Sequence, residues 1–243
     1  MQDCKSMSVP MTTNLKKLRD SATSSQDVDS ILYRQLIGSL MYLVHMRPDI
    51  CYIVNALSQF LSNPKHIHWV AAKHVLIYVR GTITYGLKYT SNSGVMLAGY
   101  ADSDWAGSAV DRKSTSGYCF SMGSAMISWF SRKQVSIAQS TTEAEYIAAS
   151  DVCKEAVSLR KLLYDLFGTK LDSTIIHCDN HSCIKLSEKS VFHNRSKHNE
   201  MKYHFIRNLV QRGTLKFLYI HTDEQIADIL TKPLTKKKFH VLS

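Results

Sequence analysis

The sequence has little proline, little glycine and no long hydrophobic run. With four prolines and ten glycines among 243 residues, little of the chain need be disordered. No stretch reaches the roughly 18 apolar residues that a membrane-spanning helix needs. The first twenty residues also lack the apolar core of a secretory signal, because Lys5, Lys16, Lys17 and Arg19 are spread among polar residues. We therefore expect an intracellular protein without a membrane partner.

Closely paired cysteines are also lacking. The six cysteines show no CxxC spacing and are scattered at Cys4, Cys51, Cys119, Cys153, Cys178 and Cys183. This distribution favours free thiols in a reducing compartment over a disulfide framework. A zinc site formed by His177, Cys178, His181 and Cys183 is an alternative. It is disfavoured because neighbouring residues of a strand face opposite ways, and Cys178 is expected to pack inward.

What the chain does have is the composition of a globular protein and an excess of positive charge. Hydrophobic residues make up 44% and charged residues 21%, and the length allows one large or two small domains. The formal net charge is +10 at pH 7. A basic surface attracts polyanions, of which nucleic acid is the commonest, although a generic basic surface that favours solubility is the alternative.

The first third of the chain predicts a leader and a helical region. Residues 1–29 are polar and rich in Ser, Thr and Asp, which indicates a flexible leader. In residues 30–82, apolar residues recur at helical spacing, with interruptions at Pro48 and Pro64 because proline cannot continue a helix. We expect a small bundle of three helices. These helices cover about residues 32–43, 49–62 and 65–79.

Beyond a Gly-, Ser- and Thr-containing boundary at residues 81–94, residues 95–240 alternate between strand and helix patterns. The expected strands are residues 95–100, 115–122, 125–130, 174–178 and 215–220. The expected helices are residues 142–167, 181–187, 200–212 and 223–231. This order predicts an α/β domain with a mixed five-stranded sheet, antiparallel at its start and parallel afterwards.

Four acidic residues stand out by their positions, namely Asp102, Glu145, Asp179 and Asp228. Functional sites in open α/β sheets gather beyond the carboxyl ends of the strands, so Asp102 and Asp179 meet there if their strands are neighbours. Clustered carboxylates repel one another unless a cation neutralises them, and oxygen ligands favour Mg²⁺ or Mn²⁺. Two such ions can activate a water and stabilise the leaving oxygen of a phosphodiester.

The sequence pattern leaves two alternatives open for these acids. Acidic residues at strand ends and helix starts are common as turn formers and N-caps without any functional role. In addition, Asp104 competes with Asp102, and Glu143 competes with Glu145, on spacing alone.

Several motifs in order resemble the C-terminal part of copia-type retrotransposon Pol polyproteins. They are Gly99-Tyr100-Ala101-Asp102-Ser103-Asp104-Trp105-Ala106-Gly107, Asp111-Arg112-Lys113-Ser114-Thr115-Ser116-Gly117, Ser140-Thr141-Thr142-Glu143-Ala144-Glu145-Tyr146, His177-Cys178-Asp179-Asn180, Lys202-Tyr203-His204-Phe205-Ile206-Arg207 and Ala227-Asp228-Ile229-Leu230-Thr231-Lys232-Pro233-Leu234. The segment Tyr33–Leu43, with Arg47-Pro48-Asp49-Ile50, resembles the end of the reverse transcriptase in the same polyproteins. The resemblance covers about residues 9–240.

This resemblance implies a ribonuclease H-like fold for residues 95–240 and cleavage of the RNA strand of an RNA–DNA hybrid. Asp102, Glu145, Asp179 and Asp228 are then the catalytic acids that bind two Mg²⁺ ions, or Mn²⁺ in their place. Glu145 is preferred over Glu143 because it directly precedes the apolar stretch from Tyr146. The implied partner, besides the hybrid, is the rest of the reverse transcriptase. The implied location is a cytoplasmic virus-like particle or the nucleus. No Tyr-x-Asp-Asp motif occurs, so no polymerase activity is expected.

Basic residues occur in the sequence between the four acidic residues. A nucleic-acid surface is predicted from Arg112, Lys113, Lys185, Lys189, Arg195, Lys197, Lys202 and Arg207, with a solvated charged helix face as the alternative. His221 follows the last strand and is a candidate for proton transfer, or else a solvent-facing loop residue.

Two other functions compete with hybrid hydrolysis. One is a catalytically silent hybrid-binding module, which includes a relic of a decayed element. The other is an integrase-like strand-transfer enzyme, because a fold and its acids do not fix one reaction.

Overall fold

A computed structural model describes residues 4–11, 26, 28–90, 96–108, 111–168, 170–188 and 197–242, with only the helical backbone for 197–203. The chain divides into two compact units. One unit comprises Met1–Leu87 with Lys232–Ser243, and the other comprises Lys88–Thr231. Most of the expected leader lies outside the described residues, as do residues 91–94 of the expected boundary and residue 95 of the first expected strand.

The first unit is helical. It contains α2 (Ser30–Val44), the 3₁₀ turn η2 (Pro48–Ile50), α3 (Cys51–Ser58), α4 (His66–Gly81) and α8 (Lys236–Leu242). Asp29 caps α2, since its carboxylate accepts hydrogen bonds from the backbone N–H groups of Ile31 and Leu32 at 2.7 and 3.4 Å. The expected helix over residues 49–62 is shorter than predicted, because Pro48 begins a 3₁₀ turn and the α-helical part ends at Ser58.

A buried polar network closes this unit. The Arg47 guanidinium donates two hydrogen bonds to the Asp49 carboxylate, from Nε at 2.9 Å and from Nη2 at 2.7 Å. The Tyr78 hydroxyl donates to the same carboxylate at 2.6 Å, and Arg47 also reaches the carbonyl and hydroxyl oxygens of Thr82. The network therefore fixes the turn before α3 against the end of α4.

The C-terminal helix α8 was not expected from the sequence. Its Phe239 is buried and meets the ring of Tyr78 edge-on, with the ring centroids 6.0 Å apart. This apolar contact is why Lys232–Ser243 groups with the helical unit, whereas the sequence pattern predicts that residues up to 240 belong with the sheet.

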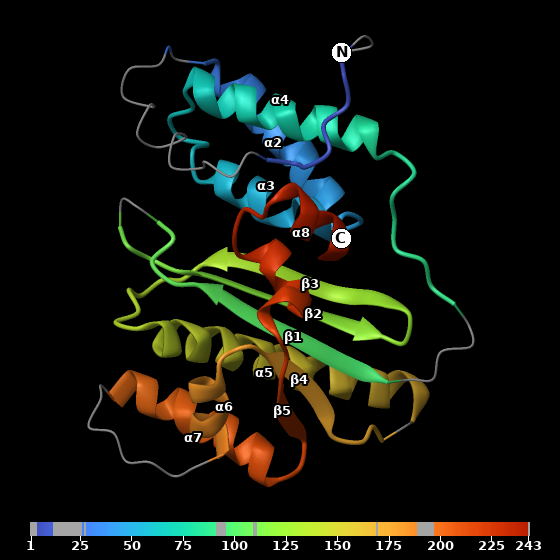
Figure 1. Cartoon of the computed structure of the whole chain (residues 1–243), viewed down its shortest axis with the longest axis vertical. Helices are drawn as coiled ribbons and strands as arrows, with labels where there is room; N and C mark the ends of the chain where they lie inside the picture. Colours follow the sequence, from blue (N-terminus) through green and yellow to red (C-terminus); the bar gives the residue numbers. More distant parts are fainter. Residues whose placement is uncertain are drawn as a thin grey trace. The chain divides into compact units, whose positions relative to one another are not determined.

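The second unit is built on five strands, β1 (Leu97–Asp104), β2 (Thr115–Met122), β3 (Ala125–Lys133), β4 (Thr174–Cys178) and β5 (Leu215–Tyr219). Their order in the sheet is β3-β2-β1-β4-β5 (Figure 1). The first three strands are antiparallel, whereas β4 pairs parallel with β1 and β5 pairs parallel with β4. The predicted fold class, a mixed five-stranded sheet with flanking helices, is confirmed.

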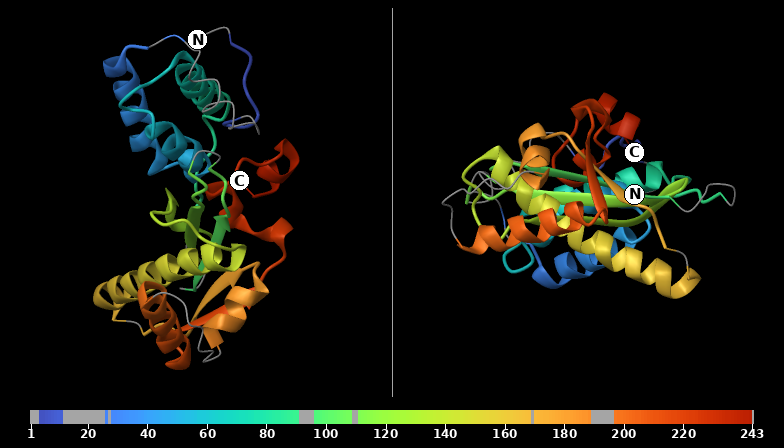
Figure 2. Two further views of the ribbon diagram at one scale, coloured as in Figure 1. Left: turned by 90° about the vertical axis from the view of Figure 1, so that its left-hand side faces the viewer. Right: turned by 90° about the horizontal axis from the view of Figure 1, so that it is seen from below.

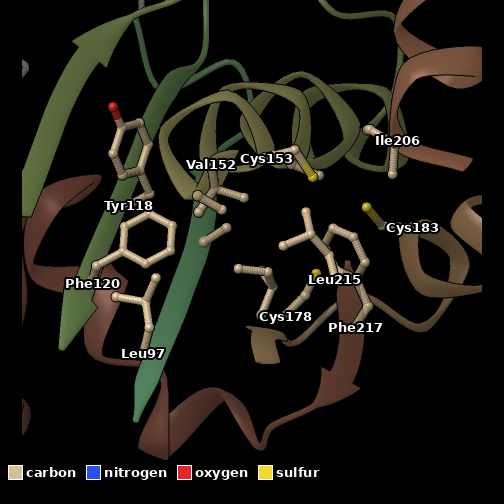
Figure 3. Close-up of a cluster of buried hydrophobic side chains, with 14 of the residues drawn as sticks. Leu97, Tyr118, Phe120, Val152, Cys153, Cys178, Cys183, Ile206, Leu215 and Phe217 are labelled. Atoms are coloured by element: carbon tan, nitrogen blue, oxygen red, sulfur yellow. The ribbon is translucent and has the colours of Figure 1, made fainter. Parts of the chain in front are cut away.

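Three helices cover one face of this sheet, α5 (Thr141–Phe167), α6 (His181–Glu188) and α7 (Lys197–Gln211) (Figures 1 and 2). Gly168, with φ of 66°, ends α5 in the left-handed conformation that glycine adopts most readily. Between helices and strands lies an apolar core that includes Phe120, Cys153 and Leu215 (Figure 3).

Two expectations for the sheet unit were wrong in detail. Strand β1 continues to Asp104, so Asp102 lies within the strand and pairs with Gly117 rather than following the strand end. The expected helix over residues 223–231 consists of two 3₁₀ turns, η3 (Thr222–Glu224) and η4 (Ile226–Leu230). The Gln225 side chain explains the break, since its amide donates to the carbonyl of Ala101 at 3.0 Å and draws the chain onto β1.

Among the described residues, no helix combines the length and the apolar character that crossing a membrane requires.

Candidate functional site

The parallel pairing of β1 and β4 sets Asp102 and Asp179 side by side. Tyr100 of β1 is in register with His177 of β4, and each acid lies two residues further along its own strand direction. Asp102 is buried within β1, and Asp179 directly follows β4 and is half-buried. The two acids predicted from the sequence to meet at the carboxyl ends of neighbouring strands are therefore at equivalent positions on adjacent strands.

Glu145 reaches this place from α5. Ser140 caps the helix by accepting a hydrogen bond from the Glu143 N–H at 3.2 Å, and Glu143 in turn accepts one from the Gln139 N–H at 2.8 Å. Glu143 therefore belongs to the helix cap, and Glu145, one residue beyond the capped turn, points to the sheet. Its Oε1 accepts hydrogen bonds from the N–H and the hydroxyl of Ser103 at 3.1 and 3.2 Å.

The second oxygen of Glu145 has no partner in the described structure. Glu145 is only 7% exposed, and its Oε2 is buried without a hydrogen bond. Burial raises the pKa of this carboxyl well above its usual range, and the side chains of Asp102, Cys178 and Asp179 raise it further. Burying a carboxylate oxygen without a hydrogen-bond donor costs free energy. A bound cation would offset this cost and would stabilise the site.

Cys178 is the member of this cluster that sequence reasoning missed. One ligand atom each from Glu145, Cys178 and Asp179 all lie within 4.8 Å of one another. Cys178 packs inward, as the strand pattern predicts, and is buried in the apolar core shown in Figure 3. The expected inward direction of Cys178 could have indicated this. The helix α5 covers the inner face of the sheet, so a thiol on that face lies on the same side as Glu145.

Asp102 is held by the segment that follows η4. Its Oδ2 accepts a hydrogen bond from the hydroxyl of Thr231, which is itself buried. Gly117, opposite Asp102 on β2, makes this approach possible, because a Cβ there would lie 2.7 Å from the Thr231 methyl group and 2.8 Å from the Leu230 Cβ. Asp102 is thus a positioned carboxylate rather than a turn former.

Asp228, the fourth predicted acid, is fully buried within η4, which packs on β1 and β2. The structure therefore places Asp102, Glu145 and Asp179 close enough for the first and third to raise the pKa of the second. It places Asp228 in the turn that packs on the strand of Asp102.

The predicted basic residues are only partly described. Arg112 and Lys185 are exposed, and Lys113 and Arg207 are half-buried. Lys189 and Arg195 lie outside the described residues, and Lys197 and Lys202 lie in α7 where the side chains are outside the description.

His221 is exposed, with its side chain at 67% of full exposure. Its Nδ1 accepts a hydrogen bond from the Asp223 N–H at 3.3 Å. The next residue, Thr222, donates from its hydroxyl to the Asp179 carboxylate at 2.9 Å. His221 therefore lies in solvent beside a residue that contacts the acidic cluster.

The two histidines of the alternative zinc site stack on other rings. The ring of His177 stacks on Tyr100 at 4.8 Å, and that of His181 stacks on Tyr219 at 3.9 Å. Within the described ranges, the metal-ligand grouping that includes Cys178 contains Glu145 and Asp179 and neither of these histidines.

The donor set fits a divalent cation. Glu145 supplies an oxygen without a partner, Asp179 supplies a half-buried carboxylate, and Asp102 adds negative charge next to them. Carboxylate oxygens are the ligands that Mg²⁺ and Mn²⁺ prefer.

The chain was compared with known proteins. No family model matches it. It is 40% identical, over 243 residues and all of its length, to the retrovirus-related Pol polyprotein from transposon RE2 of Arabidopsis thaliana. It is also 40% identical, over 99% of its length, to the corresponding polyprotein from transposon TNT 1-94 of Nicotiana tabacum. The chain spans 17% and 18% of the lengths of these two relatives.

Among solved structures, the chain is similar to LC11-RNase H1, which was isolated from compost. The identity is 15%, the match covers 56% of this chain and 93% of that chain, and the TM-score is 0.43. The resemblance found in the motifs is confirmed by the polyprotein relatives, which align over nearly every residue of the sequence. Over its whole length, the chain is therefore similar to one segment of the copia-type retrovirus-related Pol polyproteins of transposons.

Proposed function

We propose that the sheet unit hydrolyses the RNA strand of an RNA–DNA hybrid during retrotransposon reverse transcription. The observation that carries this proposal is the buried carboxylate of Glu145. Its Oε2 has no hydrogen-bond partner among the described residues, and one of its oxygens lies within 4.8 Å of a carboxylate oxygen of Asp179. A protein keeps such an arrangement at a cost in stability, which is typical of sites that bind a cation for catalysis.

Asp102, Glu145, Asp179 and Asp228 hold Mg²⁺ in this proposal, as two ions, with Mn²⁺ as the substitute. When bound, the ions supply a nucleophilic water and stabilise the leaving oxygen of the phosphodiester. The residues around the acids orient them. Ser103 fixes Glu145, Thr231 fixes Asp102, and Thr222 fixes Asp179 through the hydrogen bonds described above.

The basic residues contact the hybrid through its backbone. Arg112, Lys113, Lys185 and Arg207 belong to the described part of this surface, and Lys189, Arg195, Lys197 and Lys202 complete it by sequence. A hybrid is distinguished from DNA by its shape and its 2′-hydroxyl groups. His221, which is exposed next to Thr222, transfers a proton or assists product release. The helical unit belongs to the end of the reverse transcriptase and acts together with the remainder of the polyprotein.

The test is a cleavage assay on a labelled RNA–DNA hybrid with Mg²⁺ or Mn²⁺. Asp102→Asn, Glu145→Gln and Asp179→Asn should each reduce the cleavage rate by about a thousandfold or more, because each removes charge from the metal site. Glu143→Gln is the matched control, since Glu143 lies two residues from Glu145 and only caps α5. Equal rates for Glu145→Gln and the parent protein would refute the proposed site.

Two other outcomes would replace the proposal. Hybrid binding that weakens with salt, without metal-dependent cleavage by a folded protein, would identify a binding module. Joining of DNA ends without cleavage of the hybrid would identify a strand-transfer enzyme.

A further inference from the structure

We propose that Cys178 converts the acidic cluster into a mixed sulfur and oxygen site that binds a thiophilic divalent cation, Zn²⁺ or Cd²⁺, in competition with Mg²⁺. The ligands are the Cys178 Sγ and one carboxylate oxygen each from Glu145 and Asp179. The competition with Mg²⁺ rests on the proposed function, and the binding of the thiophilic cation does not.

The geometry needs only a small adjustment. The three ligand atoms lie within 4.8 Å of one another. Ligand atoms around a tetrahedral Zn²⁺ lie about 3.5 Å apart, given Zn–O and Zn–S bonds of about 2.0–2.3 Å. Asp179 follows β4 and is half-buried, so rotation of its side chain can close the difference, whereas Glu145 and Cys178 are fixed by α5 and β4.

A second observation shows that the site requires a ligand. Glu145 is more than nine-tenths buried, and its Oε2 has no hydrogen-bond partner among the described residues. The carboxylates of Asp102 and Asp179 place further negative charge near this carboxyl. A cation at the centre of these groups would satisfy the oxygen and remove the repulsion together.

The thiol decides which cation is preferred. Mg²⁺ is a hard ion that takes oxygen ligands, whereas Zn²⁺ and Cd²⁺ bind a thiolate strongly. The backbone N–H of Asn180 donates to the Cys178 Sγ at 3.4 Å, and this hydrogen bond stabilises the sulfur when the metal replaces its proton. A site with oxygen ligands alone would lack this preference.

Cys183 provides a matched control inside the same core. It is buried in the same apolar cluster (Figure 3). It lies outside the grouping of Glu145, Cys178 and Asp179. Cys4 is exposed and would bind Cd²⁺ by itself, so all proteins in the test carry Cys4→Ser.

The test titrates the metal-free protein with Cd²⁺ and records the ultraviolet charge-transfer band of a cadmium–thiolate bond. The band should appear in the Cys4→Ser parent and in Cys183→Ser, and should be absent from Cys178→Ser. Glu145→Gln and Asp179→Asn should weaken Cd²⁺ binding by about tenfold or more, since even outer-shell partners change metal affinity by that factor. Excess Mg²⁺ should reduce the band.

The results separate this proposal from the proposed function because the band does not depend on cleavage. An absent band, or one that Cys178→Ser retains, overturns the mixed site. An affinity that Glu145→Gln and Asp179→Asn leave unchanged also overturns it. A protein that shows the band and its dependence on Cys178 but does not cut the hybrid overturns the proposed hydrolysis alone.

Discussion

At the scale of single residues, the contrast between Glu143 and Glu145 shows how environment assigns a role. Both are glutamates near the start of α5, two positions apart. Glu143 accepts a hydrogen bond from the Gln139 N–H and completes the helix cap. Glu145 is buried against β1 beside other negative groups, and the pKa of its carboxyl is raised. The direction in which the helix presents each residue decides which one is structural.

Asp111 gives a pH-dependent prediction at the same scale. Burial opposes its ionisation, but hydrogen bonds from Lys133, Ser108 and the Lys113 N–H prevail and lower its pKa to about 2. Because the folded pKa lies below the usual value of 3.8, the stabilisation is complete above that value and is lost as the pH falls toward 2. Asp111→Asn should therefore lower the free energy of unfolding at neutral pH by less than about 1 kcal/mol, since Asp111 is partly exposed.

The measurement is denaturant unfolding of the parent and Asp111→Asn at a series of pH values. The two curves should converge in strong acid. A double-mutant cycle with Lys133→Met assigns the effect to the ion pair, whose Lys133 Nζ and Asp111 Oδ2 atoms are 2.7 Å apart. A constant difference at every pH would contradict the ionisation argument.

At the scale of elements, η4 and the residue that follows it position Asp102 on the sheet. Gln225 attaches this segment to β1, and Thr231 holds Asp102. The segment lies directly against β2 because Gly117 has no side chain. The position of one catalytic candidate therefore depends on a turn more than a hundred residues later in the sequence.

Gly117→Ala tests this dependence. Its Cβ would lie 2.7 Å from the Thr231 methyl group, so η4 must shift and the contact with Asp102 weakens. We expect the free energy of unfolding to fall by about 1–3 kcal/mol, as for other overpacked sites. Amide hydrogen exchange in residues 226–231 should also become faster.

The control is Gly38→Ala in α2, where the new Cβ meets nothing within 4 Å and should stabilise the helix by up to about 1 kcal/mol. Unchanged exchange in η4 would contradict the proposed steric role of Gly117.

At the scale of the whole molecule, the chain combines two units with different sources of stability. The sheet unit has a large apolar core between α5 and the strands. The helical unit relies in part on the buried network of Arg47, Asp49, Tyr78 and Thr82. The net charge of +10 belongs to the chain as a whole and supports a polyanionic partner.

Asp49→Ala should destabilise the helical unit by about 3–5 kcal/mol, because it leaves the Arg47 guanidinium buried without its counter-charge. Tyr78→Phe removes one hydrogen bond and should cost only about 1–2 kcal/mol. Hydrogen exchange of the α2 and α4 amides measures both effects. Similar exchange in Asp49→Ala and the parent would show that the network does not stabilise this unit.

The sequence by itself determined the class of fold and most of its elements. The strands Thr115–Met122 and Thr174–Cys178 have the predicted bounds, because alternating and apolar patterns depend on neighbouring residues alone. The family was also readable, since its motifs are short and contiguous. The helix over residues 223–231 was predicted wrongly, because Gln225 bonds to a residue that is distant in the sequence.

Only the tertiary structure decided which side chains meet. The hydrogen bond from Thr231 to Asp102, the burial of Glu145 and the presence of Cys178 in the acidic cluster all join residues from separate elements. The packing of α8 on α4 through Phe239 and Tyr78 is of the same kind. Local sequence sets each backbone segment, whereas contacts between segments depend on strand order and helix orientation, which no local pattern specifies.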